Sequence, residues 1–357
     1  MVLAFALVLP LAAAPLEVRV LEREKPVAVR LSAERIRCGA TSLVAPLELS
    51  VGRDGVTVPG QAEPCALVVA EGRVVVTVGE LKRRYPGSLS ISLEGGLLRL
   101  INTVDVETYL ASVVHAELSG APASALEAQA IVSRTFALTG RHRHERAGYH
   151  LCDLTHCQWY RGLEDGQAAA EAAVTKTKGQ VLMVGGIALK PAFFHASCGG
   201  HTSAPADVFR EAGAGPGVKD GTKKGPACRD APDFEWSWQV DRVELARALN
   251  TKPEGDAFVP LSRDRGGRVL EVSAFGKRMD GGAFASRVGH AFGWQALKSL
   301  LVTAEEVEAT VTFKGRGVGH GVGFCQHGAK ALAGEGLDAK RLLARYFPDC
   351  QVRQTEE

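Results

Sequence analysis

The stretch from Val104 to Leu138 constrains the fold most, because it has the pattern of a helix that carries an acid on its apolar face. Apolar residues recur there at steps of three and four, and one carboxyl group falls on the same stripe, which consists of Leu110, Val113, Val114, Glu117 and Leu118. Burial disfavours the charged form of a carboxyl group, so we expect Glu117 to remain protonated near neutral pH. A protonated carboxyl can act as a general acid, which cleavage of a glycosidic bond requires.

A structural interpretation of Glu117 is also open. A glutamate at the end of a helical stripe can cap the turn at Ser119 and Gly120, or it can point into solvent. The helical pattern alone does not separate these roles from a catalytic one.

Four sequence blocks follow one another between Leu97 and the C-terminus. The first block is carried by Tyr109, Leu110, Val113, Val114, Ala116, Glu117, Ala128, Gln129, Ala130, Arg134, Thr135 and Phe136. The second is LCDLTHCQWYRG (151–162), the third is FFHASCGGHTSAPADVF (193–209), and the fourth is GRGVGHGVGFCQHGAKALA (315–333). In these blocks the chain resembles the stage II sporulation protein D family, also called SpoIID/LytB.

The resemblance implies an α/β domain over residues 97–350 that has a glycan-binding groove. Members include lytic transglycosylases, which cut peptidoglycan glycan strands, and proteins that enhance wall amidases. The family's catalytic glutamate falls on Glu117. Because the blocks belong to one domain, we expect polar residues of the later blocks to line the groove beside it, namely His195, Ser197, Thr202, His320 and Gln326.

The resemblance also implies a mechanism with one carboxyl group. Glu117 would protonate the glycosidic oxygen, and the C6 hydroxyl of the muramic acid would close on C1 to give a 1,6-anhydro end. Asp105, Glu107 and Asp153 remain candidates for a second carboxylate in a hydrolytic reaction. The alternative from another class is a non-catalytic wall-binding protein that enhances an amidase.

The N-terminal part is predicted to be rich in strands. Alternating apolar and polar runs broken by Gly, Pro and Asp indicate a small β module at 15–96, so the expected class is α+β. Farther along, we expect a helix at Gly166 to Lys178, a hairpin through VLMVGGIALK that leads to His195, strands and a helix over 236–275, and a final pair of helices between Gln326 and Phe347.

The first residues, 1–14, read MVLAFALVLPLAAA and resemble the apolar part of a signal peptide with a cleavage site near Ala14. The positive n-region is missing, so either a basic leader was lost or the segment is a hydrophobic strand. It is too short to span a bilayer. We therefore expect an exported protein in an extracytoplasmic compartment, and eight cysteines agree with an oxidising one.

The net charge bears on the class of partner, and the positions of the cysteines bear on disulfide pairing. Lys and Arg total 42 against 40 acids, so the net charge of +2 gives no reason to expect nucleic acid as a partner. Cys38 and Cys65 are the two cysteines of the N-terminal part, and Cys198 and Cys228 flank a Gly/Pro-rich loop that a disulfide would restrain. Sequence does not decide either pairing.

A cluster of imidazole and sulfur ligands indicates a zinc site. Its members are His142, His144, His150, Cys152, His156 and Cys157. Such ligands at short spacing suit tetrahedral Zn²⁺. Some family members hold zinc here with two His and two Cys, which implies Cys152, His156 and Cys157. As the fourth ligand we choose His144 and not His150. His150 is only two residues from Cys152, which would leave too little room for both side chains to bind one ion.

Four protein ligands would leave no open position, so the zinc would be structural. The alternative is a disulfide between Cys152 and Cys157 with histidines exposed to solvent. The glycine run at 315–323 does not satisfy the G-x-G-x-x-G pattern, and its glycines are expected to let the backbone approach a sugar or a neighbouring strand. Cys198 and Cys325, each near a histidine, are expected to have disulfide or packing roles and not to be nucleophiles.

Overall fold

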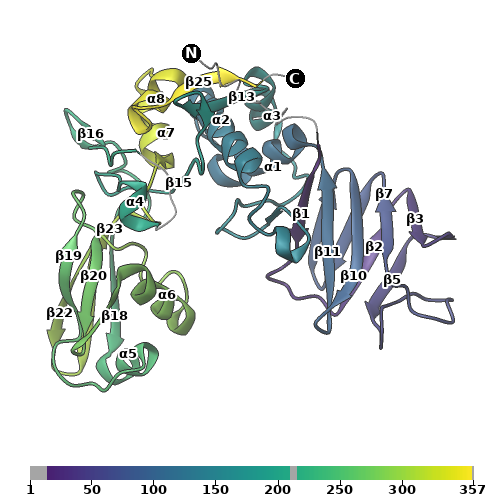
Figure 1. Ribbon diagram of the computed structural model, residues 1–357, viewed down its shortest axis with the longest axis horizontal. Helices are drawn as coiled ribbons and strands as arrows, with labels where there is room; N and C mark the ends of the chain where they lie inside the picture. The colour runs from purple at the N-terminus through teal and green to yellow at the C-terminus, as the bar shows by residue number, and fades with distance from the viewer. Residues whose placement is uncertain (1–13, 210–214, 356–357) are drawn as a thin grey trace, which may run out of the picture. The chain divides into compact units, whose positions relative to one another are not determined.

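The computed structural model describes residues 14–209 and 215–355, and its elements are labelled in Figure 1. The predicted leader at 1–14 lies outside these residues except for Ala14. Helices and strands are both abundant, which confirms the α+β class. The chain folds into two compact units: the first runs to Leu189 and also includes the C-terminal residues from Val352, and the second is Lys190–Gln351.

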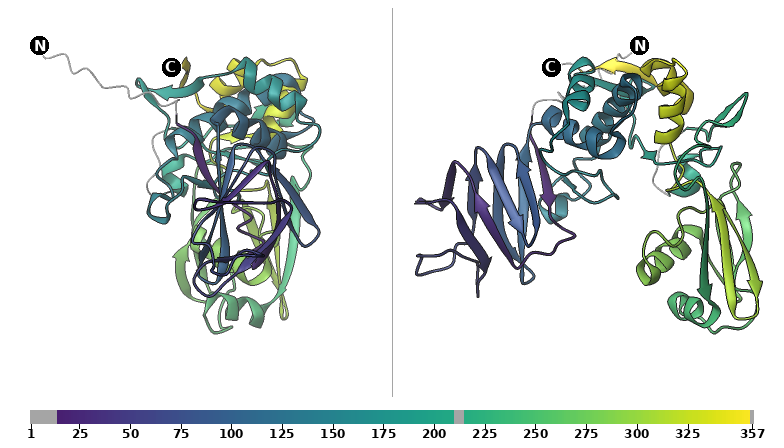
Figure 2. Two further views of the ribbon diagram at one scale, coloured as in Figure 1. Left: turned by 90° about the vertical axis from the view of Figure 1, so that its right-hand side faces the viewer. Right: turned by 180° about the vertical axis from the view of Figure 1, so that it is seen from behind.

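The first unit begins with two antiparallel sheets that pack against each other (Figure 1, Figure 2). The larger sheet has the order β12(Leu151–Cys152), β1(Leu16–Val20), β11(Leu97–Val104), β10(Ser88–Glu94), β7(Val68–Glu71), β3(Arg35–Cys38) and β4(Thr41–Leu43), and only the β1–β12 pair is parallel. The smaller has the order β6(Val56–Thr57), β5(Leu47–Val51), β2(Ala28–Ser32), β8(Val74–Val78) and β9(Leu81–Tyr85).

The core of this sandwich follows from the alternating pattern of its strands. Successive side chains of a strand point to opposite faces, so every second residue turns inward. Leu31, Val76, Leu89, Ile91 and Leu100 are accordingly buried. A disulfide joins Cys38 to Cys65, so the N-terminal cysteines are paired with each other.

The boundary expected between residues 96 and 97 falls inside this sandwich. Gly95 and Gly96 form the tight turn between β10 and β11, and both have positive φ. These two strands pair along their whole length, and β11 lies between β10 and β1. The β module therefore extends through Val104.

Three helices and a small sheet complete the first unit. The helices are α1(Val106–Leu118), α2(Ala123–Thr139) and α3(Ala168–Lys176), with a short 3-10 turn at Glu145–Ala147. The sheet has the order β14(Ile187–Ala188), β13(Gln180–Val184) and β25(Gln351–Gln354). The predicted helix near 166–178 and the predicted hairpin are thus present, and both glycines of the hairpin turn have the positive φ that a two-residue turn needs.

Arg134 joins the elements of this helical layer. Its side chain is 1% exposed, and its guanidinium donates to both carboxylate oxygens of Glu107 at 2.8 and 2.6 Å. It also donates to the carbonyl oxygens of Val174 and Gln180. One side chain on α2 therefore contacts α1, α3 and β13.

The second unit has two three-stranded antiparallel sheets and a short parallel pair. The sheets have the orders β18(Glu235–Asp241), β23(Thr310–Arg316), β22(Val302–Val307) and β19(Val259–Arg263), β20(Val269–Ala274), β21(Lys277–Asp280). The parallel pair is β15(Phe194–His195) with β24(Phe324–Cys325), and β16(Gly221–Thr222) with β17(Gly225–Pro226) forms a small hairpin. The helices are α4(Pro205–Val208), α5(Arg242–Leu249), α6(Gly281–Phe292), α7(Gln326–Gly334) and α8(Ala339–Tyr346).

An apolar cluster forms the core between the two larger sheets of this unit and α5 and α6. It includes Leu245, Phe258, Val272, Phe284 and Phe313. The strands and helix predicted over 236–275 and the final helix pair are present. Among the residues that the structure describes, no helix combines the length and the apolar character needed to cross a membrane.

Replacing Arg134 with Ala tests the buried ion pair. The change leaves the Glu107 carboxylate without its partner, so we expect a loss of about 3–5 kcal/mol in the free energy of unfolding. Lys176→Ala is the control, because that lysine makes an ion pair with Glu127 while 71% exposed, and its loss should cost about 0–1 kcal/mol. Urea unfolding measures both, and equal losses would contradict the role given to Arg134.

Candidate active site and ligand clusters

Glu117 lies in the last turn of α1, which ends at Leu118. Val114 and Leu118 are buried, as the helical stripe predicted, but Glu117 itself is only half-buried. Its Oε1 accepts a hydrogen bond of 2.9 Å from the backbone N–H of Trp159. The carboxylate is therefore held by a segment 42 residues farther along the chain, at the edge of the helical layer.

The side chain of Trp159 is exposed beside this contact. Its residue is 40% exposed, and the Arg161 guanidinium lies 3.8 Å from the ring centroid. The backbone N–H of Arg161 donates to Ser112 Oγ on α1, 3.2 Å away. The exposed part of this ring, in a residue whose backbone contacts Glu117, offers an apolar surface of the kind that packs against the C–H face of a sugar ring.

Sequence reasoning missed Trp159, although a signal was available. Gln158, Trp159 and Tyr160 are consecutive, and extended residues alternate between two faces. Both neighbours of the tryptophan point inward. Gln158 accepts a hydrogen bond from the Tyr109 hydroxyl at 3.1 Å, and the Tyr160 hydroxyl donates to Asn102 Oδ1 at 2.7 Å. The alternation therefore directs Trp159 outward.

The other acids proposed as catalytic partners have structural contacts. Asp105 is the N-cap of α1 and accepts from the backbone N–H groups of Glu107 and Thr108. Glu107 is paired with Arg134. Asp153 accepts from the backbone N–H of Leu21 at 2.6 Å, and burial raises its pKa to about 7.

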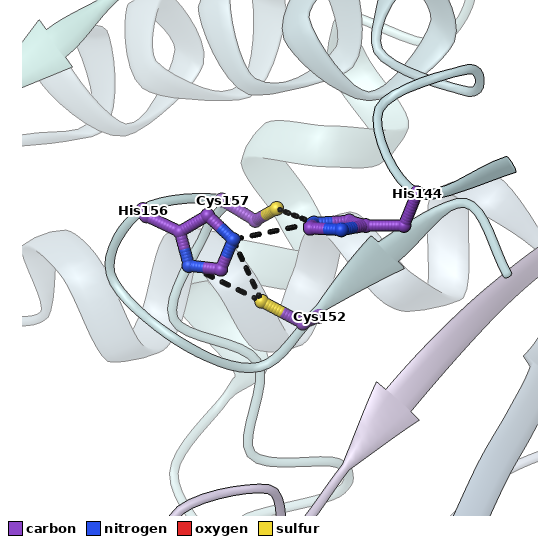
Figure 3. Close-up of side chains that lie close together, drawn as sticks. All are labelled: His144, Cys152, His156 and Cys157. Atoms are coloured by element: carbon purple, nitrogen blue, oxygen red, sulfur yellow. Dashed lines mark hydrogen bonds between the residues drawn. The ribbon is translucent and has the colours of Figure 1, made fainter. Parts of the chain in front are cut away.

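Four side chains gather directly before this segment, as Figure 3 shows: His144, Cys152, His156 and Cys157. Each offers a ligand atom, and these four atoms lie within 4.8 Å of one another. His144 Nε2 is 3.3 Å from Cys157 Sγ and 3.2 Å from His156 Nε2. Cys152 Sγ is 3.6 Å from His156 Nε2.

These distances match a tetrahedral metal site. Zinc bonds of about 2.0 to 2.3 Å place the ligands of a tetrahedron about 3.3 to 3.8 Å apart. The hydrogen bond from Cys152, with others from His156 and His144, lowers the pKa of the Cys157 thiol to about 3, and the thiolate is the form that binds metal.

The two alternatives for this cluster do not agree with the structure. Cys152 and Cys157 are both free thiols, so the alternative disulfide is absent. His150 lies elsewhere, because its Nδ1 accepts a hydrogen bond from the backbone N–H of Glu17. The choice of His144 as fourth member of the group therefore agrees with the geometry.

The five residues predicted to line a groove lie in the second unit, and most of them are buried. His195, Ser197, Thr202 and Gln326 are each at most 5% exposed. Thr202 Oγ1 accepts from the backbone N–H of Val218 at 2.8 Å. His320 is half-buried, and its ring contacts those of Phe193, His195 and Phe209. That these residues share a groove with Glu117 stays a prediction.

Burial also lowers the pKa of His195 and of His320. For His320 the pKa falls to about 4. Both imidazoles are therefore neutral at pH 7. His320 Nδ1 accepts a hydrogen bond from the backbone N–H of Val322, and His195 Nδ1 lies 3.0 Å from the Val322 carbonyl oxygen. These two contacts with Val322 help to fix the glycine-rich loop.

The glycines of that loop permit close backbone packing. Gly317 and Gly323 have positive φ, and a Cβ at these positions would lie 2.6 Å from the Ser197 carbonyl oxygen and 2.3 Å from that of Phe193. The predicted approach to a neighbouring strand is therefore observed.

The disulfide between Cys198 and Cys228, which the sequence left open, is not formed in the structure. Both are free thiols with their sulfur atoms 3.5 Å apart. These sulfurs belong to a larger buried group that also contains Asp220 and Cys325.

Comparison with known proteins bears on the family suggested by the four sequence blocks. Residues 94–184 match the model of the SpoIID family, described as Stage II sporulation protein. Together with the similarity to named relatives, this match supports the resemblance to the SpoIID family.

Three relatives illustrate the similarity. An uncharacterized protein of Brachyspira hyodysenteriae is 27% identical, over 74% of this chain and 70% of the relative. The Stage II sporulation protein D of Bacillus subtilis is 24% identical, over 72% of this chain and 76% of its own length. The Amidase enhancer of the same organism is 26% identical, over 63% of this chain but only 37% of its own length.

Gly162 ends the segment that carries Trp159, and its substitution tests how tightly that segment packs. Its φ is +75°, and a Cβ would lie 2.1 Å from the Arg84 carbonyl oxygen. Gly96→Ala is the control, because Gly96 has φ +78° but no atom near its Cβ position. We expect Gly96→Ala to cost about 1–2 kcal/mol from backbone conformation alone, and Gly162→Ala to cost clearly more. Chemical denaturation would contradict this packing if it gave the same value for both.

Proposed function

We propose that this protein is an exported lytic transglycosylase that cleaves peptidoglycan glycan strands with Glu117 as its general acid. The observation that carries the proposal is the position of Glu117, whose carboxyl group is held by the backbone N–H of Trp159, a residue with an exposed indole. The match of residues 94–184 to the SpoIID family model supports it. The indole would bind one sugar ring and place the neighbouring glycosidic oxygen near the acid.

In the proposed reaction, protonated Glu117 gives its proton to the oxygen between N-acetylmuramic acid and N-acetylglucosamine. The C1–O bond breaks, and the muramic acid C6 hydroxyl bonds to C1. Glu117, now a carboxylate, takes the proton of that hydroxyl and returns to its starting state. No water is consumed, and the product ends in a 1,6-anhydro sugar.

One carboxyl group suffices for this route because the nucleophile is part of the substrate. Hydrolytic glycosidases instead use two carboxyl groups on either side of the bond. The engagement of Asp105 with the helix N-terminus and of Glu107 with Arg134 supports the single-carboxyl route. Of the residues in the second unit, we propose that His320 contacts the glycan, because it has exposed surface.

We further propose that His144, Cys152, His156 and Cys157 hold one structural Zn²⁺. The chemistry of this donor set and its spacing fit tetrahedral coordination with all four positions filled by protein. Such an ion would cross-link the loop and supply no open position for substrate. Since Cys157 precedes Trp159 by two residues, fixing the loop also fixes the N–H group that holds Glu117.

A second candidate function is enhancement of a wall amidase without glycan cleavage. It is favoured by the similarity to the Amidase enhancer of Bacillus subtilis. In that case the indole would bind wall glycan and the acidity of Glu117 would be irrelevant. Export to an extracytoplasmic compartment is part of both proposals, and the Cys38–Cys65 disulfide supports it.

Glu117→Gln separates the two functions. The amide keeps the shape of the carboxyl but has no acidic proton to give, so we expect release of anhydro-sugar products from denuded glycan strands to fall by at least about 10²-fold. Mass spectrometry measures the products. Glu171→Gln is the control, since Glu171 is an exposed acid on α3, and it should cleave like the wild type.

Equal product release by the Glu117 variant and the wild type would remove Glu117 from the mechanism. Absence of products from the wild type, combined with stimulation of an amidase by both proteins, would establish the enhancer function instead.

Cys157→Ser tests the zinc proposed for His144, Cys152, His156 and Cys157, which we call the first cluster. Loss of one of two thiolate ligands should remove about one zinc per chain and lower the melting temperature, because a filled tetrahedral site contributes directly to folding. Glycan cleavage should fall as well, through displacement of Trp159. Metal analysis and thermal unfolding are the measurements, and a purified wild type that carries a Cys152–Cys157 disulfide would disprove the site.

A further inference from the structure

We propose that the second unit binds a second structural zinc ion through Cys198, Asp220, Cys228 and Cys325. This site is independent of the proposed cleavage reaction and of the cluster around Cys157. It would hold together three segments of the second unit that are far apart in the sequence.

The four residues come from segments that pack side by side. Cys325 ends β24, and Cys198 lies three residues beyond His195, the β15 residue that pairs with it. Asp220 and Cys228 stand on either side of the β16–β17 hairpin, which brings the two ends of that loop together. All four residues are buried.

The donor atoms are spaced as a tetrahedral ion requires. They all lie within 4.8 Å of one another. Cys198 Sγ is 3.2 Å from Asp220 Oδ2 and 3.5 Å from Cys228 Sγ. These distances are close to the separation of about 3.3 to 3.8 Å between the ligands of tetrahedral zinc. In an iron–sulfur cluster the four ligands are distributed over two or four irons, so ligands on different irons would lie farther apart than these donors do.

Hydrogen bonds from the protein orient the donors. The backbone N–H groups of Cys198 and Gly328 donate to Cys325 Sγ, and that of Gly200 donates to Cys198 Sγ, at 3.3 to 3.4 Å. Arg345 Nε donates to Asp220 Oδ1 at 3.2 Å, which leaves Oδ2 directed at the sulfurs. Hydrogen bonds of this kind commonly orient the side chains that bind a metal ion.

The surrounding charges also suit a thiolate-rich zinc site. Three thiolates and a carboxylate around Zn²⁺ carry a net charge of −2, and two guanidinium groups are close by. Arg345 pairs with Asp220, and Arg268, which is 2% exposed, donates to the Cys198 carbonyl oxygen. Buried charges need such partners, so the arginines match the charged, metal-bound state of the ligands.

Gly328 allows the start of α7 to pack closely against this group of donors. A Cβ on Gly328 would lie 2.4 Å from Asp220 Oδ2 and 3.2 Å from Cys325 Sγ. The φ of Gly328 is not in the left-handed region, so the glycine is required by space and not by backbone conformation. With four buried protein ligands the site is closed, which makes it structural and not catalytic.

Metal content of the full-length protein tests the proposal. We expect about two zinc ions per wild-type chain and about one in Cys228→Ser, because the three remaining donors form an incomplete site. Cys350→Ser is the matched control, since Cys350 is a free thiol outside both clusters, and it should keep two. A zinc that persists in Cys157→Ser and disappears in Cys228→Ser would establish this site even if the first cluster binds none.

X-ray absorption at the zinc edge gives a readout on the wild type that does not depend on a variant folding. Two sulfurs at one site and three at the other predict an average of about 2.5 sulfur ligands per zinc. A wild type with one zinc, bound by two sulfurs and lost in Cys157→Ser, would overturn the second site. Peptide mapping that finds Cys198 joined to Cys228 would overturn it as well.

Discussion

The buried ion pair between Arg134 and Glu107 is the contact on which the helical layer of the first unit depends. It ties the first turn of α1 to the middle of α2, and the same guanidinium reaches the end of α3 and the start of β13. The last turn of α1 is fixed separately, by the hydrogen bond from Trp159 to Glu117. The helix that carries the proposed acid is therefore restrained at both ends, and side-chain disorder of Glu117 is limited before any substrate arrives.

Irregular segments carry most of the chemistry in both units. The chain between α2 and α3 contains only a 3-10 turn and a two-residue strand, yet it supplies Trp159 and four ligand-bearing side chains. The segments around Asp220 and Cys228 are similar in this respect. Such loops have few backbone ladders to stabilise them, so the metal ions proposed above would supply order that regular secondary structure does not.

Much of the first unit was predictable because its patterns are local. Helical periodicity identified α1, alternation identified the sandwich strands, and the close spacing of Cys152, His156 and Cys157 identified the first cluster. The partial burial of Glu117 was not predictable. Periodicity gives the face of the helix on which a residue lies, but not how deeply that face is covered near the helix end.

The second cluster could not be read from the sequence for a different reason. Cys198 and Cys325 are 127 residues apart, and only the parallel pairing of β15 with β24 brings them together. Asp220 gives no signal at all, because an isolated aspartate in a Gly-rich loop resembles any turn residue. Likewise, the buried state of Ser197 and Thr202 follows from tertiary packing that no local pattern encodes.

Strand β1 has a consequence for how the protein folds. It lies between β11 and β12, and its contact with the β12 region joins Glu17 to His150, 133 residues away. Contacts of such long range form late, because a large loop must close before they give any stabilisation. One edge of the alternating strand Leu16–Val20 therefore stays unpaired during synthesis until the chain has passed β12, although its other edge can already pair with β11.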